Sequence, residues 1–188
     1  SGIKPVDALA GANLGWQITS FFSWPSCDFM ETTKVAVIGL GTVGSGVAQI
    51  LLSHGDRIAR QAGRQLELGP IIVRDVKKPR QLQLPEGLLS SDIESLINDS
   101  TIPVVIQLIG GLEPARTIML RLLESGKDVV TANKALLAEH GSELFDRARE
   151  EGRSIAFEAS VGGGIPIIMA IGQSLSANRI ESLCGILN

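Results

Sequence analysis

Three glycines near the start of the regular part of the chain have the spacing of a phosphate-binding loop. Gly39, Gly41 and Gly44 follow the apolar run VAVI and precede a segment whose apolar residues recur at helical spacing. In such a loop the first glycine allows a tight turn, the second lets the backbone approach a pyrophosphate, and the third lets helix and strand pack closely. Unpaired N–H groups at the helix start favour the anionic phosphates. We therefore expect a dinucleotide to bind at Gly39, Gly41, Thr42, Val43 and Gly44. The alternative is a glycine-rich turn without a ligand.

A lysine follows an apolar strand in the run Thr131-Ala132-Asn133-Lys134. Desolvating its ammonium without a partner is costly, so Lys134 points either into water or into a site. Two other strands end unusually, at Gly110-Gly111 and at the glycine-rich stretch 158–166. In an open α/β sheet the carboxyl ends of the strands face one crevice. We therefore expect Gly110 to contact the coenzyme and Lys134 to point at the coenzyme and a polar substrate.

The end of the second expected strand bears on the choice between NAD and NADP. An acidic residue there binds the ribose 2′-hydroxyl, whereas a basic residue accommodates a 2′-phosphate. The chain supplies both types, as Arg74-Asp75, with Lys78 and Arg80 close behind. We place Arg74 at the adenosine ribose, with Lys78 or Arg80 as support. The preference stays open with a lean to NADP, and a solvated charge cluster is the alternative.

Strands that are apolar on both faces alternate with helices along the chain, which is typical of a parallel sheet covered on both sides. We therefore predict an α/β fold with a Rossmann-type doubly wound, mostly parallel sheet. The expected strands are 34–40, 66–76, 102–111, 128–133, 154–161 and 179–188, and the expected helices are 42–63, 91–99, 113–127, 134–152 and 164–177.

The composition is that of an ordinary globular protein, with 44% hydrophobic and 20% charged residues. The net charge of −3 gives no broad attraction to nucleic acid, and no run reaches the roughly 18 apolar residues of a membrane span. Two distant cysteines, Cys27 and Cys184, favour reduced thiols over a disulfide framework. We expect a cytoplasmic protein with neither nucleic acid nor membrane as partner.

Residues 1–29 show neither helical nor strand periodicity and are too polar for a secretion signal. Met30 then opens a sequence that reads like a natural start. We interpret 1–29 as an N-terminal extension or a leader introduced in cloning. The alternative is an arm that packs its aromatic residues, Trp16, Phe21, Phe22 and Trp24, on an apolar face or a neighbouring chain.

Four motifs, in this order, closely resemble homoserine dehydrogenase: VAVIGLGTVGSGV, LIGGLEPAR, VVTANKALLAEHG and FEASVGGGIPII. The resemblance extends from Lys34 to Asn188. Members of that family are NAD(P)-dependent oxidoreductases that interconvert L-aspartate 4-semialdehyde and L-homoserine in threonine and methionine biosynthesis. The resemblance thus implies these small-molecule substrates, and a homodimer or larger assembly for the full-length enzyme.

The resemblance also implies roles for particular residues. Lys134 would lie between nicotinamide and substrate as the catalytic residue, polarising the oxygen of the reacting carbon. A monovalent cation, Na⁺ or K⁺, would be held mainly by carbonyl oxygens of a glycine-rich turn, which can aim several carbonyls at one centre. The implied cation ligands are Glu158, Val161, Gly163 and Ile165. The alternatives are an exposed helix-start lysine and a plain strand-to-helix turn.

The chain departs from the family pattern in two respects. Gln107 stands where members usually carry an acidic residue, and we expect it inside a strand with little functional effect. In the family, GILN runs on into a substrate-binding and dimerising domain. We therefore expect an NAD(P)-binding domain at 30–160, the start of a truncated substrate and dimerisation region at 161–188, and a chain that binds coenzyme but is largely inactive.

Two other functions are compatible with parts of the sequence. A non-catalytic sensor or assembly module would need the glycine loop but no lysine in the crevice. A related amino-acid dehydrogenase, such as one acting on aspartate, would share the architecture. The stretch EASVGGGIP argues against that enzyme.

Overall fold

The computed structural model describes residues 31–182, 184 and 185. The expected leader at 1–29, its aromatic residues and Cys27 lie outside this range. Within it the chain builds one six-stranded sheet in the order β3-β2-β1-β4-β5-β6, and every neighbouring pair is parallel. The strands are β1 (Thr32–Ile38), β2 (Gln65–Ile72), β3 (Leu89–Ser90), β4 (Val104–Gln107), β5 (Asp128–Thr131) and β6 (Ile155–Ala156).

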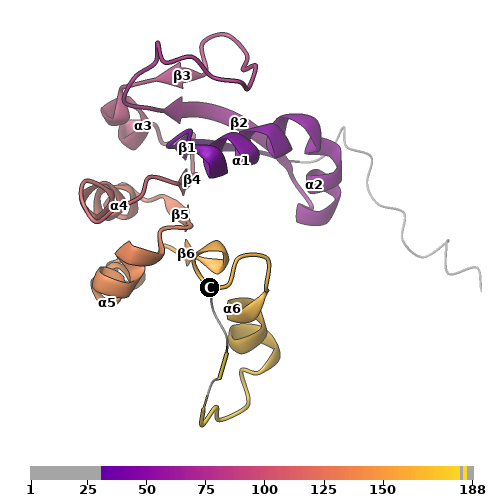
Figure 1. The fold of residues 1–188 in the computed structure, drawn as a ribbon, viewed down its shortest axis with the longest axis vertical. Coiled ribbons are helices and arrows are strands. Elements are labelled where there is room, and N and C mark those ends of the chain that lie inside the picture. Colours follow the sequence, from indigo (N-terminus) through magenta and orange to yellow (C-terminus); the bar gives the residue numbers. More distant parts are fainter. Residues whose placement is uncertain (1–30, 183, 186–188) are drawn as a thin grey trace, which may run out of the picture.

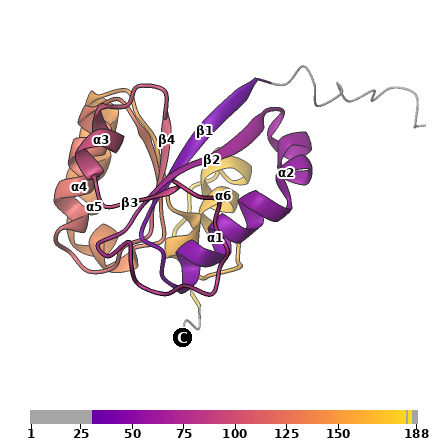
Figure 2. The same ribbon diagram turned by 90° about the horizontal axis from the view of Figure 1, so that it is seen from above.

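Helices cover both faces of the sheet (Figures 1 and 2). One face carries α1 (Thr42–Ser53) and α2 (Gly55–Ala62), and the other carries α3 (Ile93–Asn98), α4 (Ala115–Glu124) and α5 (Lys134–Glu150). Each layer has its own aliphatic core: Val37 and Ile71 pack with Ala48 of α1, whereas Val105 and Val129 pack with residues of α4 and α5. Strands buried on both faces explain the continuous apolar runs in the sequence, and the doubly wound α/β prediction is confirmed.

The strand order reverses at β1, which lies between β2 and β4. The register aligns Ile38 with Ile72 on one side and with Gln107 on the other, and Gln107 in turn aligns with Thr131. Four strands therefore end at one edge of the sheet. In an open α/β sheet this reversal opens a crevice at the carboxyl edge, where ligands bind.

The expected elements differ from the observed ones in several places before α4. The expected strands 66–76 and 102–111 end at Ile72 and Gln107, so Arg74 and Gly110 lie in the chain that follows each strand. The predicted helix 42–63 is two helices, because the chain leaves helical geometry at His54 (φ −127°, ψ 23°) and restarts at Gly55. The break was not predicted because the helical spacing of apolar residues continues across it. Gly55, which follows Ser53-His54, was the available sign of a helix end. The two-residue strand β3 was not predicted, since a strand so short has no recognisable alternation.

The C-terminal elements differ more. The expected strand 154–161 shortens to β6 and is followed by the 3₁₀ helix η3 (Glu158–Ser160). The expected helix 164–177 shortens to α6 (Ile167–Met169) and the π-helix η4 (Ala170–Ser174). The expected strand 179–188 is absent from its described residues, 179–182, 184 and 185. A strand needs a partner for its backbone groups, and β6 at the sheet edge offers only two residues.

The described part of the chain contains no helix with the length and apolar character needed to cross a bilayer.

Candidate functional site: a groove at the carboxyl edge of the sheet

The three glycines of the loop between β1 and α1 have different surroundings. Gly39 has φ +96° and donates its N–H to the Ile72 carbonyl at 2.9 Å, so the first position makes the tight turn. A Cβ on Gly44 would lie 2.1 Å from the Gly39 carbonyl oxygen, so the third position permits the helix to approach the loop. A Cβ on Gly41, by contrast, would meet nothing within 4 Å. The open space over Gly41 fits the close approach of a pyrophosphate.

A groove of about 820 Å³ opens at this edge of the sheet. Its walls come from the glycine loop, from the chain after β2 and from the chain between β4 and α4. Four predicted coenzyme residues, Gly39, Gly41, Arg74 and Gly110, line it together. The other predicted loop residues, Thr42, Val43 and Gly44, form the first turn of α1 beside the groove. An apolar wall completes it, formed by Ile93, Ile109, Pro114 and Ile118.

The basic residues after β2 differ in what they contact. The Arg80 guanidinium donates to the carbonyl oxygens of Asp75 at 2.6 Å and Lys78 at 2.8 Å, so it holds its own loop in shape. The Asp75 carboxylate accepts from the N–H of Lys77 at 2.9 Å. Arg74 is exposed on the groove wall, and within the described residues its guanidinium has no hydrogen bond. Lys78 also lines the groove, is exposed and makes no side-chain hydrogen bond to the described residues, so Arg74 and Lys78 are the cations with the most freedom to meet a ligand.

Lys134 is the first residue of α5 and is exposed. It stands at the carboxyl edge, directly after β5, but it is not among the residues that line the groove. Its ammonium makes no hydrogen bond or ion pair to any residue in the described ranges. The structure thus brings Lys134 to the predicted edge of the sheet without burying it.

The residue before Lys134 was missed as a site residue. Asn133 is 8% exposed, and its Nδ2 donates to the carbonyl oxygens of Ile109 at 3.1 Å and Gly111 at 2.7 Å. Its Oδ1 accepts from the N–H of Leu136 at 3.1 Å and caps α5. An asparagine before a helix is a recognisable N-cap signal, but the bonds to the loop after β4 depend on the sheet order and leave no mark in the local sequence.

A chain of buried side chains continues below Asn133. Gln107 was expected inside a strand and is the last residue of β4; it is fully buried, and its Oε1 accepts from the Thr131 hydroxyl at 3.0 Å. The Thr131 hydroxyl oxygen accepts from the backbone N–H of Asn133, and the Ser160 hydroxyl donates to the Thr131 carbonyl. Gln107 Nε2 is buried without a hydrogen-bond partner in the described part of the chain. These bonds join the ends of β4 and β5 to η3.

The glycine-rich turn after β6 was predicted to hold a cation through Glu158, Val161, Gly163 and Ile165. The Glu158 carboxylate is engaged elsewhere, since it accepts from the N–H groups of Ile168 and Met169 at 2.9 Å each. The carbonyls of Val161 and Gly163 accept no hydrogen bond from the described residues, whereas those of Glu158 and Ile165 accept from the N–H groups of Val161 at 3.3 Å and Ile167 at 2.8 Å. Nor do these residues contain a metal-binding group of three or more His, Cys, Asp or Glu side chains. The turn therefore fits a cation only through carbonyl oxygens.

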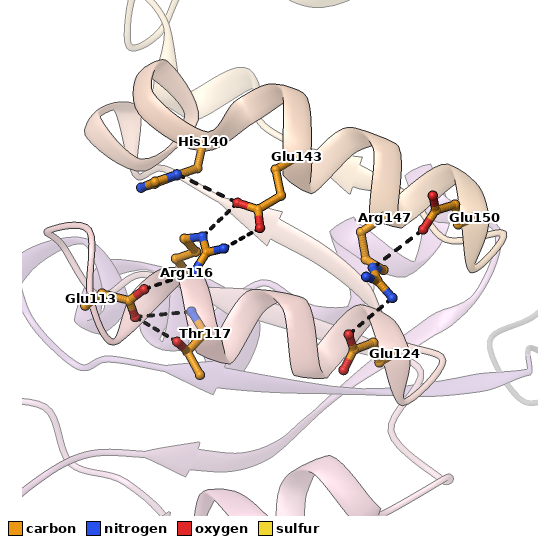
Figure 3. A network of polar contacts seen from close by, with 8 residues as sticks. All are labelled: Glu113, Arg116, Thr117, Glu124, His140, Glu143, Arg147 and Glu150. Atoms are coloured by element: carbon orange, nitrogen blue, oxygen red, sulfur yellow. Dashed lines mark hydrogen bonds and ion pairs between the residues drawn. The ribbon is translucent and has the colours of Figure 1, made fainter.

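Ion pairs connect α4 and α5, one near the start of α4 and one at its end (Figure 3). Arg116 binds both oxygens of Glu143, with Nε to Oε2 at 2.7 Å, and the hydrogen bonds from this guanidinium lower the pKa of Glu143. Glu113, which lines the groove, accepts from the Thr117 hydroxyl at 2.9 Å, and this bond lowers its pKa. The carboxylate in the groove wall is therefore held by α4 itself.

Comparisons with known proteins agree with this geometry. Residues 39–158 match the family model described as homoserine dehydrogenase, NAD binding domain. The chain is 45% identical over 157 residues to a homoserine dehydrogenase of Synechocystis, covering 84% of this chain and 36% of that protein. With the Bacillus subtilis enzyme the identity is 43%, with 85% and 37% covered. The chain thus spans little more than a third of the length of these relatives.

Solved structures give the same result. A homoserine dehydrogenase from Thiobacillus denitrificans superposes with a TM-score of 0.74 at 42% identity, covering 81% of this chain and 36% of that one. The family model covers well over half of the 188 residues. A strand order of 3-2-1-4-5-6, a glycine loop with an open second position and this match lead to one conclusion: the chain belongs to the homoserine dehydrogenase NAD-binding domain family.

Proposed function

We propose that this chain is the coenzyme-binding part of an enzyme that interconverts L-aspartate 4-semialdehyde and L-homoserine with NAD(P)H. The observation that carries the proposal is the open space over Gly41 at the rim of a groove that Arg74 also lines. Anionic phosphates would bind at the start of α1, whose first turn holds no acidic side chain. When bound, the coenzyme supplies or accepts the hydride.

Lys134 is the catalytic residue in this proposal. Its exposed ammonium at the start of α5 stands at the carboxyl edge that carries the groove. A positive charge there would stabilise the negative charge that develops on the substrate oxygen during hydride transfer to the carbonyl. The residues that grip the rest of the substrate are not assigned to this chain, so we propose that it turns over little by itself.

Arg74 is the residue we assign to the adenosine ribose, and it favours NADP over NAD. Its guanidinium suits a 2′-phosphate, for which a bidentate charged hydrogen bond is strong and specific. The carbonyl groups of Glu158, Val161, Gly163 and Ile165 are the ligands we propose for a Na⁺ or K⁺ ion. Gly162 at φ +54° and Gly164 at φ +83° give this turn a path that other residues rarely adopt.

Binding and turnover can be measured separately on the 188-residue chain. Calorimetric titration with NADPH and NADH should give saturable binding. NADPH oxidation in the presence of L-aspartate 4-semialdehyde should stay close to the background rate. Absence of binding would overturn the coenzyme assignment, whereas robust turnover would overturn only the proposal that the chain needs further residues for catalysis.

A further inference from the structure

We propose that Asn133 is a positioning residue that couples the coenzyme groove to Lys134. The inference rests on the proposed function and assigns a role to a residue that is not among those lining the groove. It starts from one observation: a single buried side chain binds both the loop that lines the groove and the helix start that carries the lysine.

The two donors of Asn133 hold the loop after β4. They reach the carbonyls of Ile109 and Gly111, which flank Gly110. Ile109 and Gly110 both line the groove. Because the amide is 8% exposed, water does not readily replace these bonds. A shift of the loop at Gly110 must therefore either break them or move the amide.

The acceptor of Asn133 holds the start of α5. Its Oδ1 binds the N–H of Leu136, and its backbone N–H binds the Thr131 hydroxyl. Asn133 is thus fixed through its backbone and its side chain. The Lys134 ammonium makes no hydrogen bond or ion pair with the described residues, so its direction depends on the backbone that Asn133 holds.

A ligand that settles against Gly110 is thereby linked to the direction of Lys134. If Asn133 only stabilised the fold, its substitution would change the affinity for coenzyme and the unfolding midpoint and nothing else. Substitution of a coupling residue would also change how well the coenzyme, once fully bound, protects the Lys134 ammonium from solvent reagents. That difference makes the role of Asn133 measurable.

The substitution Asn133→Asp separates the two roles. An aspartate keeps the oxygen that caps α5, and Asp is as good an N-cap as Asn. It replaces the donor with a second oxygen that faces the carbonyls of Ile109 and Gly111, so the loop loses its tie. The matched control is Asp99→Asn, the converse exchange, at a side chain that accepts from Thr101 and lies away from the groove. If Asn133→Asp does not fold, Asn133→Ser keeps a capping oxygen and removes the amide donor.

The readout is acetylation of lysine amines by acetic anhydride, followed by mass spectrometry, with and without saturating NADPH. The exposed Lys34 in β1 serves as the internal reference. In the wild type and in Asp99→Asn, NADPH should slow labelling of Lys134 at least about tenfold relative to Lys34, a factor that corresponds to about 1.4 kcal/mol. In Asn133→Asp most of this protection should be lost, even at NADPH concentrations that saturate the variant.

Two results would contradict the proposal, and each overturns a different part of it. Equal protection of Lys134 in the wild type and in Asn133→Asp at saturation would overturn the coupling role alone. A wild-type Lys134 that bound NADPH leaves unprotected would overturn the proposed place of the lysine, and with it this inference. A ligand without nicotinamide, 2′-phospho-ADP-ribose, should bind without protecting Lys134.

Discussion

The carbonyl oxygen of Gly39 approaches the Cα of Gly44 so closely that a Cβ atom on Gly44 would lie 2.1 Å from it. This contact joins the turn after β1 to the first turn of α1. It accounts for the third glycine of the motif by packing alone, whereas the second glycine has no such packing reason. The two positions therefore give different predictions.

Gly44→Ala should destabilise the fold. The methyl group would force the helix away from the loop, and overpacking of this kind costs about 1–3 kcal/mol of the free energy of unfolding. Gly46→Ala is the matched control in the same helix, because its Cβ would meet nothing within 4 Å. That variant should gain up to about 1 kcal/mol from helix propensity. Urea denaturation of both measures the difference, and equal stabilities would contradict the packing role of Gly44.

Arg74→Ala should weaken NADPH binding more than NADH binding. The loss of a charged hydrogen bond of about 1.5–3 kcal/mol corresponds to roughly 10- to 150-fold in affinity for NADPH. NADH lacks the 2′-phosphate and should lose much less. Arg60→Ala, on α2 and outside the groove, is the control that removes the same charge. Parallel losses for both coenzymes in Arg74→Ala would argue against a 2′-phosphate contact.

Lys127→Met should destabilise the chain at neutral pH. Lys127 is 1% exposed at the opposite edge of the sheet, and its Nζ donates to the carbonyls of Asp99 at 2.6 Å and Ile102 at 3.1 Å. Methionine fills similar space but leaves both buried carbonyls without this donor, at a cost of about 1–3 kcal/mol. Thermal and urea unfolding should show the loss, and coenzyme affinity should stay unchanged.

The same lysine gives a pH dependence with a defined sign. Burial lowers the pKa of Lys127 below its ordinary value of 10.5. The folded chain therefore binds this proton less tightly than the unfolded chain, and the contribution of Lys127 to stability rises as the pH increases toward 10.5. The stability difference between the wild type and Lys127→Met should grow over that range. A difference that shrinks instead would show that the carbonyls raise the pKa more than burial lowers it.

The sequence was informative at positions where the local backbone conformation or packing allows only one type of residue. The positive φ of Gly39 and the close contact at Gly44 both require glycine, and the two residues lie in one short loop. Their spacing is therefore visible in the sequence. The apolar runs of β1 and β4 likewise reflect burial on both faces of the sheet. The alternation of strands and helices indicates a parallel sheet with right-handed crossovers, but it does not determine the order of the strands.

Other features depend on contacts between segments far apart in the sequence. The bonds from Asn133 to Ile109 and Gly111 exist because β4 and β5 are neighbours, which no local pattern reports. Arg74 and Arg80 both line the groove, but only the Arg80 guanidinium is bound to its own loop, a difference that the residue types could not reveal. The expected strand 179–188 was wrong in its described residues because apolar alternation does not supply a pairing partner.

The most direct test of the central claim is a calorimetric titration of NADPH into Gly41→Val beside the wild type. Gly41 has φ −81°, which valine can adopt, and the added side chain would meet no protein atom at its Cβ, so the variant should fold, with a modest loss of stability because valine is a poorer N-cap than glycine. The side chain would occupy the space proposed for the pyrophosphate. We predict a loss of affinity of at least about 100-fold, which corresponds to roughly 2.7 kcal/mol. A folded Gly41→Val that binds NADPH as tightly as the wild type would contradict the assignment of the glycine loop as the coenzyme site.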